Sequence, residues 1–489
     1  MSPAHSRGGR RWMVVGLVVV AVAGIAVAGR SKGAAAPGAP TLTPGASVSA
    51  PNAESSAWYC TGESTASGQL AQGSVVLTNT STKAVTGSIA AVTDSGATSA
   101  APVSVPARGQ VVADVPAPAS GSWLSQVVLL SGGGVAVSQT VHGPNGWSEA
   151  PCQSGTSQQW YFASGLTSGS NALFVALFNP TSTADVVDMS FVTPAGIMHP
   201  INFQGIVLQP NETQVENVGA FVQNQSRIAT TVSTRTGRVV ASELQVLSGN
   251  GNGLAIVPGA PRAEKEWSIP QSLEVAGGTS SIDIYNPGST TERVTVQGRL
   301  LTGTLAPFVN TVAPDSTWAI STSTQTRIPK VDAYSTIVTA SGGDGVVVSR
   351  NVAAPSTAQA PQAGFAGAVD GLSAASPSRL WAVPSPGTAA QPALPGVQPD
   401  HLALTNTTSH RETYVVYVMT AKATRTIASG TLRPFGFISL GAATLFGAGL
   451  NPLLVRSSGD VAISEDIGPA GTYGVVTMTG LPLSASLAG

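Results

Sequence analysis

The chain has 489 residues, of which 42% are hydrophobic and 10% charged, and its formal net charge at pH 7 is -1. A chain of this length is long enough for several domains, and its balanced charge provides no basic field that would attract nucleic acid. Its 55 glycines and 34 prolines favour β-rich domains with frequent turns.

The N-terminus carries a basic stub, residues 1–11, with Arg7, Arg10 and Arg11. It precedes an uncharged apolar run that we interpret as a transmembrane signal-anchor over residues 12–29. At 1.5 Å per residue the run spans about 26 Å, enough for a bilayer core. The arginines predict a cytoplasmic N-terminus. A cleaved signal peptide is the alternative, with residues 26–28 (Ala-Val-Ala) as its cleavage site.

Residues 30–54 are rich in Ala, Pro, Gly and Ser. Such a segment buries little apolar surface, so it does not offset the entropy lost on ordering. We therefore expect a disordered tether that lifts the following domains away from the membrane.

Beyond the tether the chain repeats itself four times. In each repeat a Trp comes first, and an Asn then follows an alternating apolar run and opens a turn. A Pro and a Val-rich strand that ends in Ser come later in each repeat. Self-similarity at a fixed period indicates a unit that folds and stacks. The repeated residues are Trp58, Trp160, Trp267 and Trp381, with Asn79, Asn179, Asn286 and Asn406.

The repeat predicts four units, each near the usual size of one domain and each closing its own core. Their predicted ranges are 55–157, 158–262, 263–375 and 376–489. An Ala/Pro/Ser/Gly-rich stretch, 353–379, lies at the junction of the third and fourth ranges and is typical of a linker.

The second unit illustrates the expected architecture. Short runs with period-2 alternation, separated by turns, predict seven or eight strands, the pattern of an antiparallel sandwich. The expected fold is thus all-β, with four tandem immunoglobulin-like β-sandwich units behind one N-terminal transmembrane helix. The predicted strands cover 160–162, 172–178, 185–192, 206–208, 213–218, 227–233, 238–246 and 254–257.

The chain has two cysteines, Cys60 and Cys152, near the start and end of the first unit. Outside the cytosol such a pair is expected to form a disulfide, since the ends of a domain commonly lie close together. Two buried free thiols are the alternative. A metal site is disfavoured because no further Cys or His stands at ligand spacing.

The sequence offers no recognisable reaction centre. The five histidines show no metal-ligand spacing, and a Gly-x-Ser-x-Gly elbow is absent. We therefore assign no catalytic, cofactor-binding or metal residues and expect no enzyme activity. The repeated Trp is either a core anchor or a sugar-stacking platform; recurrence in every unit favours the core. The repeated Asn is expected to cap the turn after its strand.

The layout resembles an uncharacterised family of actinobacterial membrane-anchored secreted proteins of unknown function. The features that carry this resemblance are the Arg-led anchor, the Trp starts at Trp58 and Trp160, the Asn-Pro or Thr-Ser turns, and the Val-rich strands ending in Ser. It covers residues 12–489 and implies a location in the envelope of a Gram-positive actinobacterium. It supplies no catalytic residues.

These observations predict a membrane-anchored extracytoplasmic protein without enzyme activity, or a secreted one if the signal is cleaved. We expect a scaffold, interaction or adhesion role in the cell envelope. Envelope proteins or cell-wall glycans are the expected partners, with no cofactor. Two alternatives stay open: a carbohydrate-binding module array acting on cell-wall polysaccharide, and a divergent accessory subunit of an envelope enzyme.

Overall fold

The computed structural model describes residues 46–483 apart from several short gaps. The predicted stub 1–11 and anchor 12–29 lie outside the described residues. Within the described ranges, no helix is long and apolar enough to cross a membrane. The gaps fall at 66–68, 115–117, 119, 249–252, 273, 275–277, 330–332, 354–365, 371, 374–376, 386–396, 446–447, 450 and 470–475.

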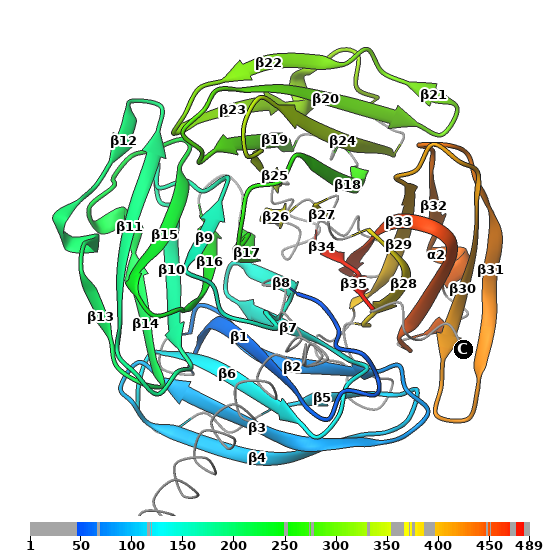
Figure 1. Ribbon diagram of the computed structural model, residues 1–489, viewed down its shortest axis with the longest axis horizontal. Helices are drawn as coiled ribbons and strands as arrows, with labels where there is room; N and C mark the ends of the chain where they lie inside the picture. The colour runs from blue at the N-terminus through cyan, green and yellow to red at the C-terminus, as the bar shows by residue number, and fades with distance from the viewer. Residues whose placement is uncertain are drawn as a thin grey trace, which may run out of the picture. The chain divides into compact units, whose positions relative to one another are not determined.

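The described chain is all-β, as predicted, and its strands form sandwich-like pairs of sheets (Figure 1). The first pair consists of one sheet in the order β1-β6-β3-β4 and a second in the order β5-β2-β7-β8. Its strands are β1 (Ser56–Ser64), β2 (Gln72–Asn79), β3 (Val85–Thr93), β4 (Thr98–Val105), β5 (Gln110–Ala113), β6 (Trp123–Leu130), β7 (Val135–Gly143) and β8 (Gly146–Pro151).

The second pair has the orders β12-β11-β15-β9, with β13 also on β11, and β14-β10-β16-β17. The strand bounds match the predicted ranges to within a few residues; only the short β12 was not predicted. The elements are β9 (Gln159–Phe162), β10 (Ala172–Asn179), β11 (Asp185–Thr193), β12 (Gly196–Met198), η1 (Ile201–Phe203), β13 (Ile206–Leu208), β14 (Glu212–Asn217), η2 (Val218–Ala220), β15 (Ala229–Thr236), β16 (Val240–Leu247) and β17 (Gly253–Pro258).

The third pair has the orders β21-β20-β24-β18-β27, with β22 also on β20, and β23-β19-β25-β26. Its strands β26 and β27 lie inside the stretch predicted to be a linker. Backbone pairing needs no particular side chain, so composition alone conceals such strands. The elements are β18 (Glu266–Ser272), β19 (Thr279–Asn286), β20 (Glu292–Leu300), β21 (Gly303–Thr304), β22 (Phe308–Val312), β23 (Ser316–Ser321), η3 (Thr322–Thr324), β24 (Tyr334–Ser341), β25 (Val347–Ala353), β26 (Ala366–Asp370) and β27 (Leu372–Ser373).

In the fourth repeat the long strand β33 joins both layers, so its strands count as one sheet. β33 pairs with β30 and β28 through its first part and with β29 and β34 through its last part. The elements are β28 (Ser378–Val383), β29 (Val397–Asn406), β30 (Glu412–Met419), β31 (Thr424–Leu432), β32 (Phe437–Gly441), α2 (Ala442–Leu445), β33 (Leu453–Pro469), β34 (Val476–Thr479) and β35 (Leu481–Pro482).

The strand order differs from that of an immunoglobulin domain. In that fold the first strand lies beside the second, whereas here β1 lies beside β6 and β2 belongs to the other sheet. The prediction of immunoglobulin-like units is therefore confirmed only as far as sandwich-like sheets. The sequence pattern reports which residues alternate along a strand, but it does not report which strands become neighbours.

Each pair of sheets buries a hydrophobic cluster of its own, centred on the repeated Trp. The clusters extend into neighbouring pairs; Trp147, for example, joins the cluster around Trp381. Two smaller clusters lie between the first and second pairs, around Leu244 and around Phe178. The packing is therefore continuous from one pair to the next.

Within Pro44–Gly489 each pair contacts the next, and the fourth contacts the first. The innermost strands contact one another in the sequence β8, β17, β26, β34 and back to β8; Figure 1 shows them gathered between the four pairs. Hydrogen bonds link Thr61 to Ser242 (2.7 Å), Thr231 to Tyr285 (2.8 Å), Thr405 to Pro270 (3.1 Å) and Gln110 to Ser385 (2.9 Å).

The last residues of the predicted tether are ordered against this framework. Val48 is buried and forms a parallel bridge with Leu483, and the Gly134 N–H donates to the carbonyl of Ser49. Backbone hydrogen bonds and one buried apolar side chain thus order this segment. The chain that precedes β1 therefore contacts the chain that follows β34.

Candidate functional site

The four repeated tryptophans are all core residues. Trp58, Trp160 and Trp381 are at most 1% exposed and Trp267 is 5% exposed. Their indole N–H groups, where bonded, donate to backbone carbonyls: Trp160 to Val239 at 2.9 Å and Trp381 to Ser378 at 2.9 Å. Rings that are buried in this way present no face on which a glycan could stack.

The four repeated asparagines each close a turn by the same hydrogen bonds. In the second pair, Asn179 Nδ2 donates to the carbonyls of Thr183 (2.7 Å) and Leu208 (3.2 Å), while Oδ1 accepts from the Thr181 N–H (2.8 Å). The side chain thereby ties the turn to a distant strand end. The equivalent residues Asn79, Asn286 and Asn406 make matching bonds.

A third repeated feature, an acidic residue at the start of equivalent strands, was not predicted from the sequence. Asp185, Glu292 and Glu412 begin equivalent strands, and each lies against a glycine-containing turn. A Cβ on Gly237 would lie 1.5 Å from Asp185 Oδ1, and one on Gly459 would lie 2.2 Å from the Glu412 carboxyl carbon. The signal in the sequence was the acidic residue that begins this strand in three of the four repeats; in the first repeat Val85 begins it. These carboxylates therefore lie where the glycine-containing turn approaches most closely.

The predicted disulfide is present. Cys60 and Cys152 are joined, and their Cα atoms are 4.7 Å apart. Cys60 also directly precedes Thr61, which hydrogen-bonds to Ser242 of the second pair. The crosslink therefore holds one end of the first pair's core and the start of its interface with the second pair.

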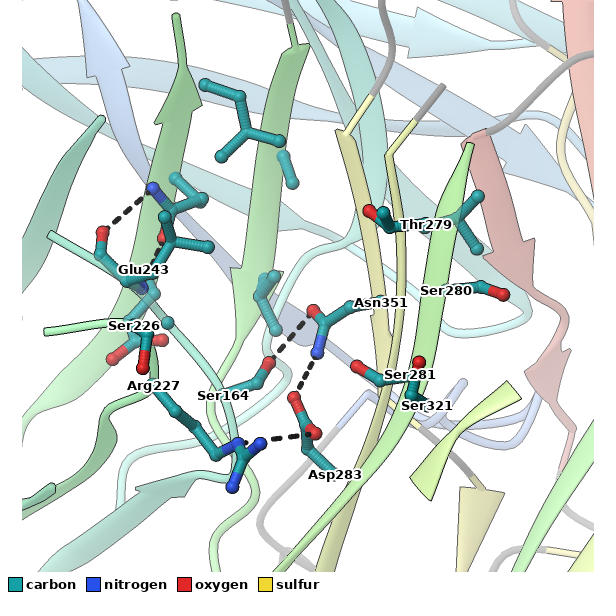
Figure 2. A pocket seen from close by; sticks show the side chains of 17 residues that line it. Ser164, Ser226, Arg227, Glu243, Thr279, Ser280, Ser281, Asp283, Ser321 and Asn351 are labelled. Carbon is teal, nitrogen blue, oxygen red and sulfur yellow. Dashed lines mark hydrogen bonds and ion pairs between the residues drawn. The ribbon is translucent and has the colours of Figure 1, made fainter. Parts of the chain in front are cut away.

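A cavity with a volume of about 280 Å³ lies between the second and third pairs (Figure 2). Its mouth is formed by exposed hydroxyl residues, including Ser226, Thr279 and Ser321. Its floor includes the buried residues Ala255 and Val257. The cavity therefore combines a polar rim with a partly apolar floor, as small-molecule sites do.

A polar network crosses this cavity from one pair of sheets to the other. Arg227 Nε lies 3.8 Å from Asp283 Oδ1, and Asn351 Nδ2 donates to Asp283 Oδ2 at 2.5 Å. Ser164 Oγ in turn donates to Asn351 Oδ1 at 3.0 Å. Figure 2 shows Arg227 and Ser164 facing Asp283 and Asn351 across the cavity. The network thus brings together groups from both sides.

Asp283 is almost fully buried, and this has an electrostatic consequence. Burial raises the pKa of its carboxyl group to about 6, although the positive charge of Arg227 acts in the opposite direction. Perturbed carboxyl groups of this kind cluster at functional sites. None of Arg227, Asp283 and Asn351 was singled out from the sequence; the signal was the single charge within the apolar run that ends at Asn286.

The histidines do not gather into a site. Within the described residues, no group of three or more His, Cys, Asp or Glu side chains could hold a metal ion. The cavity between the second and third pairs therefore becomes the candidate site on the strength of its shape and its polar network.

An all-β protein with sandwich-like sheets and a polar cavity between two of them is a class with many possible roles. The family of unknown function DUF5719 matches residues 131–431, which is more than half of the chain. The chain therefore belongs to this family.

Other comparisons add little. No curated protein matches the chain. A crystal structure of a tetra-tandem repeat in the extending region of a large adhesion protein is 13% identical and covers 83% of this chain and 93% of its own. Its TM-score is 0.12, so it carries no argument about this protein.

Proposed function

We propose that the protein is a membrane-anchored, extracytoplasmic protein of the cell envelope that acts as a scaffold or interaction protein and not as an enzyme. The observation that carries the proposal is the contact of each pair of sheets with the next, closed by the contact of the fourth with the first. Mutual packing of this kind gives a stiff frame whose loops and edges are available to partners.

Two further observations support an envelope location. The disulfide is typical of compartments outside the cytosol. The arginine-led apolar run at 12–29 has the length and charge asymmetry of a signal-anchor. In this proposal four tandem sandwich units, with the boundaries predicted above, stand outside the membrane of an actinobacterium. Envelope proteins or cell-wall glycans are their partners.

Protease treatment of intact cells, followed by N-terminal sequencing of the mature protein, tests the location. We expect the region from residue 46 onward to be accessible from outside and the mature N-terminus to lie before residue 12. A new terminus near Gly29 would replace the anchor by a cleaved signal. A protein that is shielded in intact cells and cleaved only after lysis would contradict the proposed location.

Crosslinking in intact cells followed by affinity purification tests the scaffold role. We expect specific adducts with envelope proteins or wall glycans, recovered equally with wild type and with the surface variant Asp188→Asn. Recovery of the uncrosslinked monomer alone would contradict a scaffold role.

A further inference from the structure

The repeat provides an internal control for the cavity between the second and third pairs. In each repeat one residue of the second strand lies opposite the Ser that ends the Val-rich run. Val76 lies opposite Ser138, Ala176 opposite Ser242 and Ala403 opposite Ser464. Asp283 lies opposite Ser349. Three repeats thus place a small apolar residue where the third places a buried carboxylate.

A second position differs between the second and third repeats. Ser281 and Asn351 form a register pair in the third repeat, where the second repeat has Phe174 and Leu244. The first and fourth repeats are polar at this position too, with Ser74 opposite Thr140 and His401 opposite Asp466. Burial of a carboxylate or an amide is unfavourable unless it is fully hydrogen-bonded. Because the second repeat builds the same fold with Ala176, Phe174 and Leu244, the fold itself does not require the polar set of the third. A requirement other than folding therefore accounts for it.

The lining indicates the chemistry of an occupant. Hydroxyl groups of Ser and Thr both donate and accept hydrogen bonds, and six residues of this kind line the cavity: Ser164, Ser226, Thr279, Ser280, Ser281 and Ser321.

The charged side chains of the lining further restrict the chemical class of the ligand. Asp283 and Glu243 are carboxylates that face a single cation, Arg227, so an anionic ligand such as phosphate is disfavoured. Arg227 Nε, at 3.8 Å, is too distant to donate a hydrogen bond to Asp283 Oδ1, and the Ser281 hydroxyl also interacts with this carboxyl group. Because an ionised carboxylate accepts up to about four hydrogen bonds, Asp283 can accept a further one from a ligand hydroxyl.

The size of the cavity restricts the occupant to one small molecule. Pockets for drug-sized ligands hold about 300–1,000 Å³, and this one holds about 280 Å³. Its floor includes the apolar side chains of Ala255, Val257 and Val352, against which the C–H face of a sugar ring can lie.

We infer that the cavity between the second and third pairs binds a single neutral hexopyranose, with Asp283 and Asn351 hydrogen-bonding its hydroxyl groups. The inference rests on the proposed function in one respect: the protein binds its ligand and does not convert it. The sugar is either free or the terminal unit of a wall glycan; both present the same ring and hydroxyls.

The direct test is isothermal titration of the full-length chain, purified in a detergent without a sugar headgroup, with D-glucose, D-mannose and D-galactose in turn. We expect at least one of them to bind saturably with one site per chain. The variant Asp283→Ala/Asn351→Leu, which copies the second repeat, should weaken binding at least tenfold, or about 1.4 kcal/mol. Ser281→Phe, which fills the cavity, provides a second variant if the first does not fold.

Asp188→Asn is the matched control. Asp188, on the outer strand β11, pairs with the exposed Arg235 and is not part of the cavity lining, so the affinity of this variant should equal that of wild type. Absence of saturable binding by all three hexoses would overturn the inference, as would equal affinity in the cavity variants. Saturable binding of phosphate or calcium, lost in the same variants, would also overturn it.

Two further readouts separate the inference from the proposed function. Conversion of the bound sugar, followed by NMR over time, would keep the site and contradict the non-enzymatic proposal. Competition by a wall oligosaccharide that ends in the same hexose would identify a glycan terminus as the source, whereas binding of the free sugar alone would identify a soluble ligand.

Discussion

The interface between the first and second pairs and the interface between the second and third pairs occupy equivalent places in the repeat but are built differently. At the former, Trp123 packs on Phe174 with ring centroids 5.1 Å apart, and Leu244 lies in an apolar cluster. At the latter, the positions of Phe174 and Leu244 are occupied by Ser281 and Asn351 beside a cavity.

The difference is confined to one end of the interface. Further along, the rings of Tyr161 and Tyr285 pack edge to face between the second and third pairs, with centroids 6.5 Å apart. At the equivalent place between the first and second pairs, the rings of Tyr59 and Phe178 pack in a tilted arrangement at 6.2 Å. Apolar packing therefore holds both interfaces together. The polar end of the second–third interface therefore lies beside an aromatic contact that has a counterpart at the first–second interface.

The largest expected effect concerns the covalent support beside the first–second interface. Cys60→Ser removes the crosslink and should lower the free energy of unfolding of the oxidised full-length chain by roughly 2–5 kcal/mol. Urea denaturation measures it. Cys152→Ser should have the same effect, and the double variant should add nothing further. Labelling of free thiols in the folded wild type would contradict the crosslink.

The next effect compares the two interfaces directly. Phe174→Ala removes a partly buried ring that packs on Trp123, so the free energy of unfolding should fall by roughly 2–4 kcal/mol. Ser281→Ala at the register-equivalent position should change it by less than about 0.5 kcal/mol. A similar decrease in the free energy of unfolding in both variants would contradict the distinction between an apolar first–second interface and a polar second–third interface.

A smaller effect is expected from pH. Burial raises the pKa of Glu63 and of Glu149 to about 8, although each accepts a hydrogen bond. Between pH 4.5 and 8 the unfolded chain loses these protons while the folded chain retains them, so stability should fall as pH rises.

The thermal midpoint measured from pH 4.5 to 8.5 tests this expectation. Glu149→Gln should flatten the fall over the whole range. Asp283→Ala should flatten only the part below about pH 6, because the raised pKa of Asp283 lies there. A midpoint that rises steadily with pH over this range would contradict the burial of neutral carboxyl groups.

The features that recur in the repeats could be predicted from the sequence. Trp160, Asn179 and the strands of the second pair follow from alternation and turn residues within one unit, and Cys60 with Cys152 follows from compartment and spacing. The strand β26 was concealed by an Ala/Gly-rich composition, and the burial of Val48 depends on a neighbour more than 400 residues away, Leu483.

The site depends on three-dimensional neighbours in the same way. Asp283 and Asn351 come from different strands, β19 and β25, while Arg227 and Ser164 come from another pair of sheets. Alternation within one strand does not indicate which residues meet across such an interface. Alignment of the four repeats by strand register would have exposed Asp283, because its three counterparts are apolar.

The central claim is that the polar end of the second–third interface serves a ligand and does not serve the fold. The most direct measurement is the free energy of unfolding of Asp283→Ala/Asn351→Leu beside wild type, by urea denaturation at pH 7 without any sugar. Since the variant replaces a buried carboxylate and amide by the residues of the second repeat, we predict equal or greater stability. A loss of more than about 2 kcal/mol would show that the polar network is needed for folding and would contradict the account.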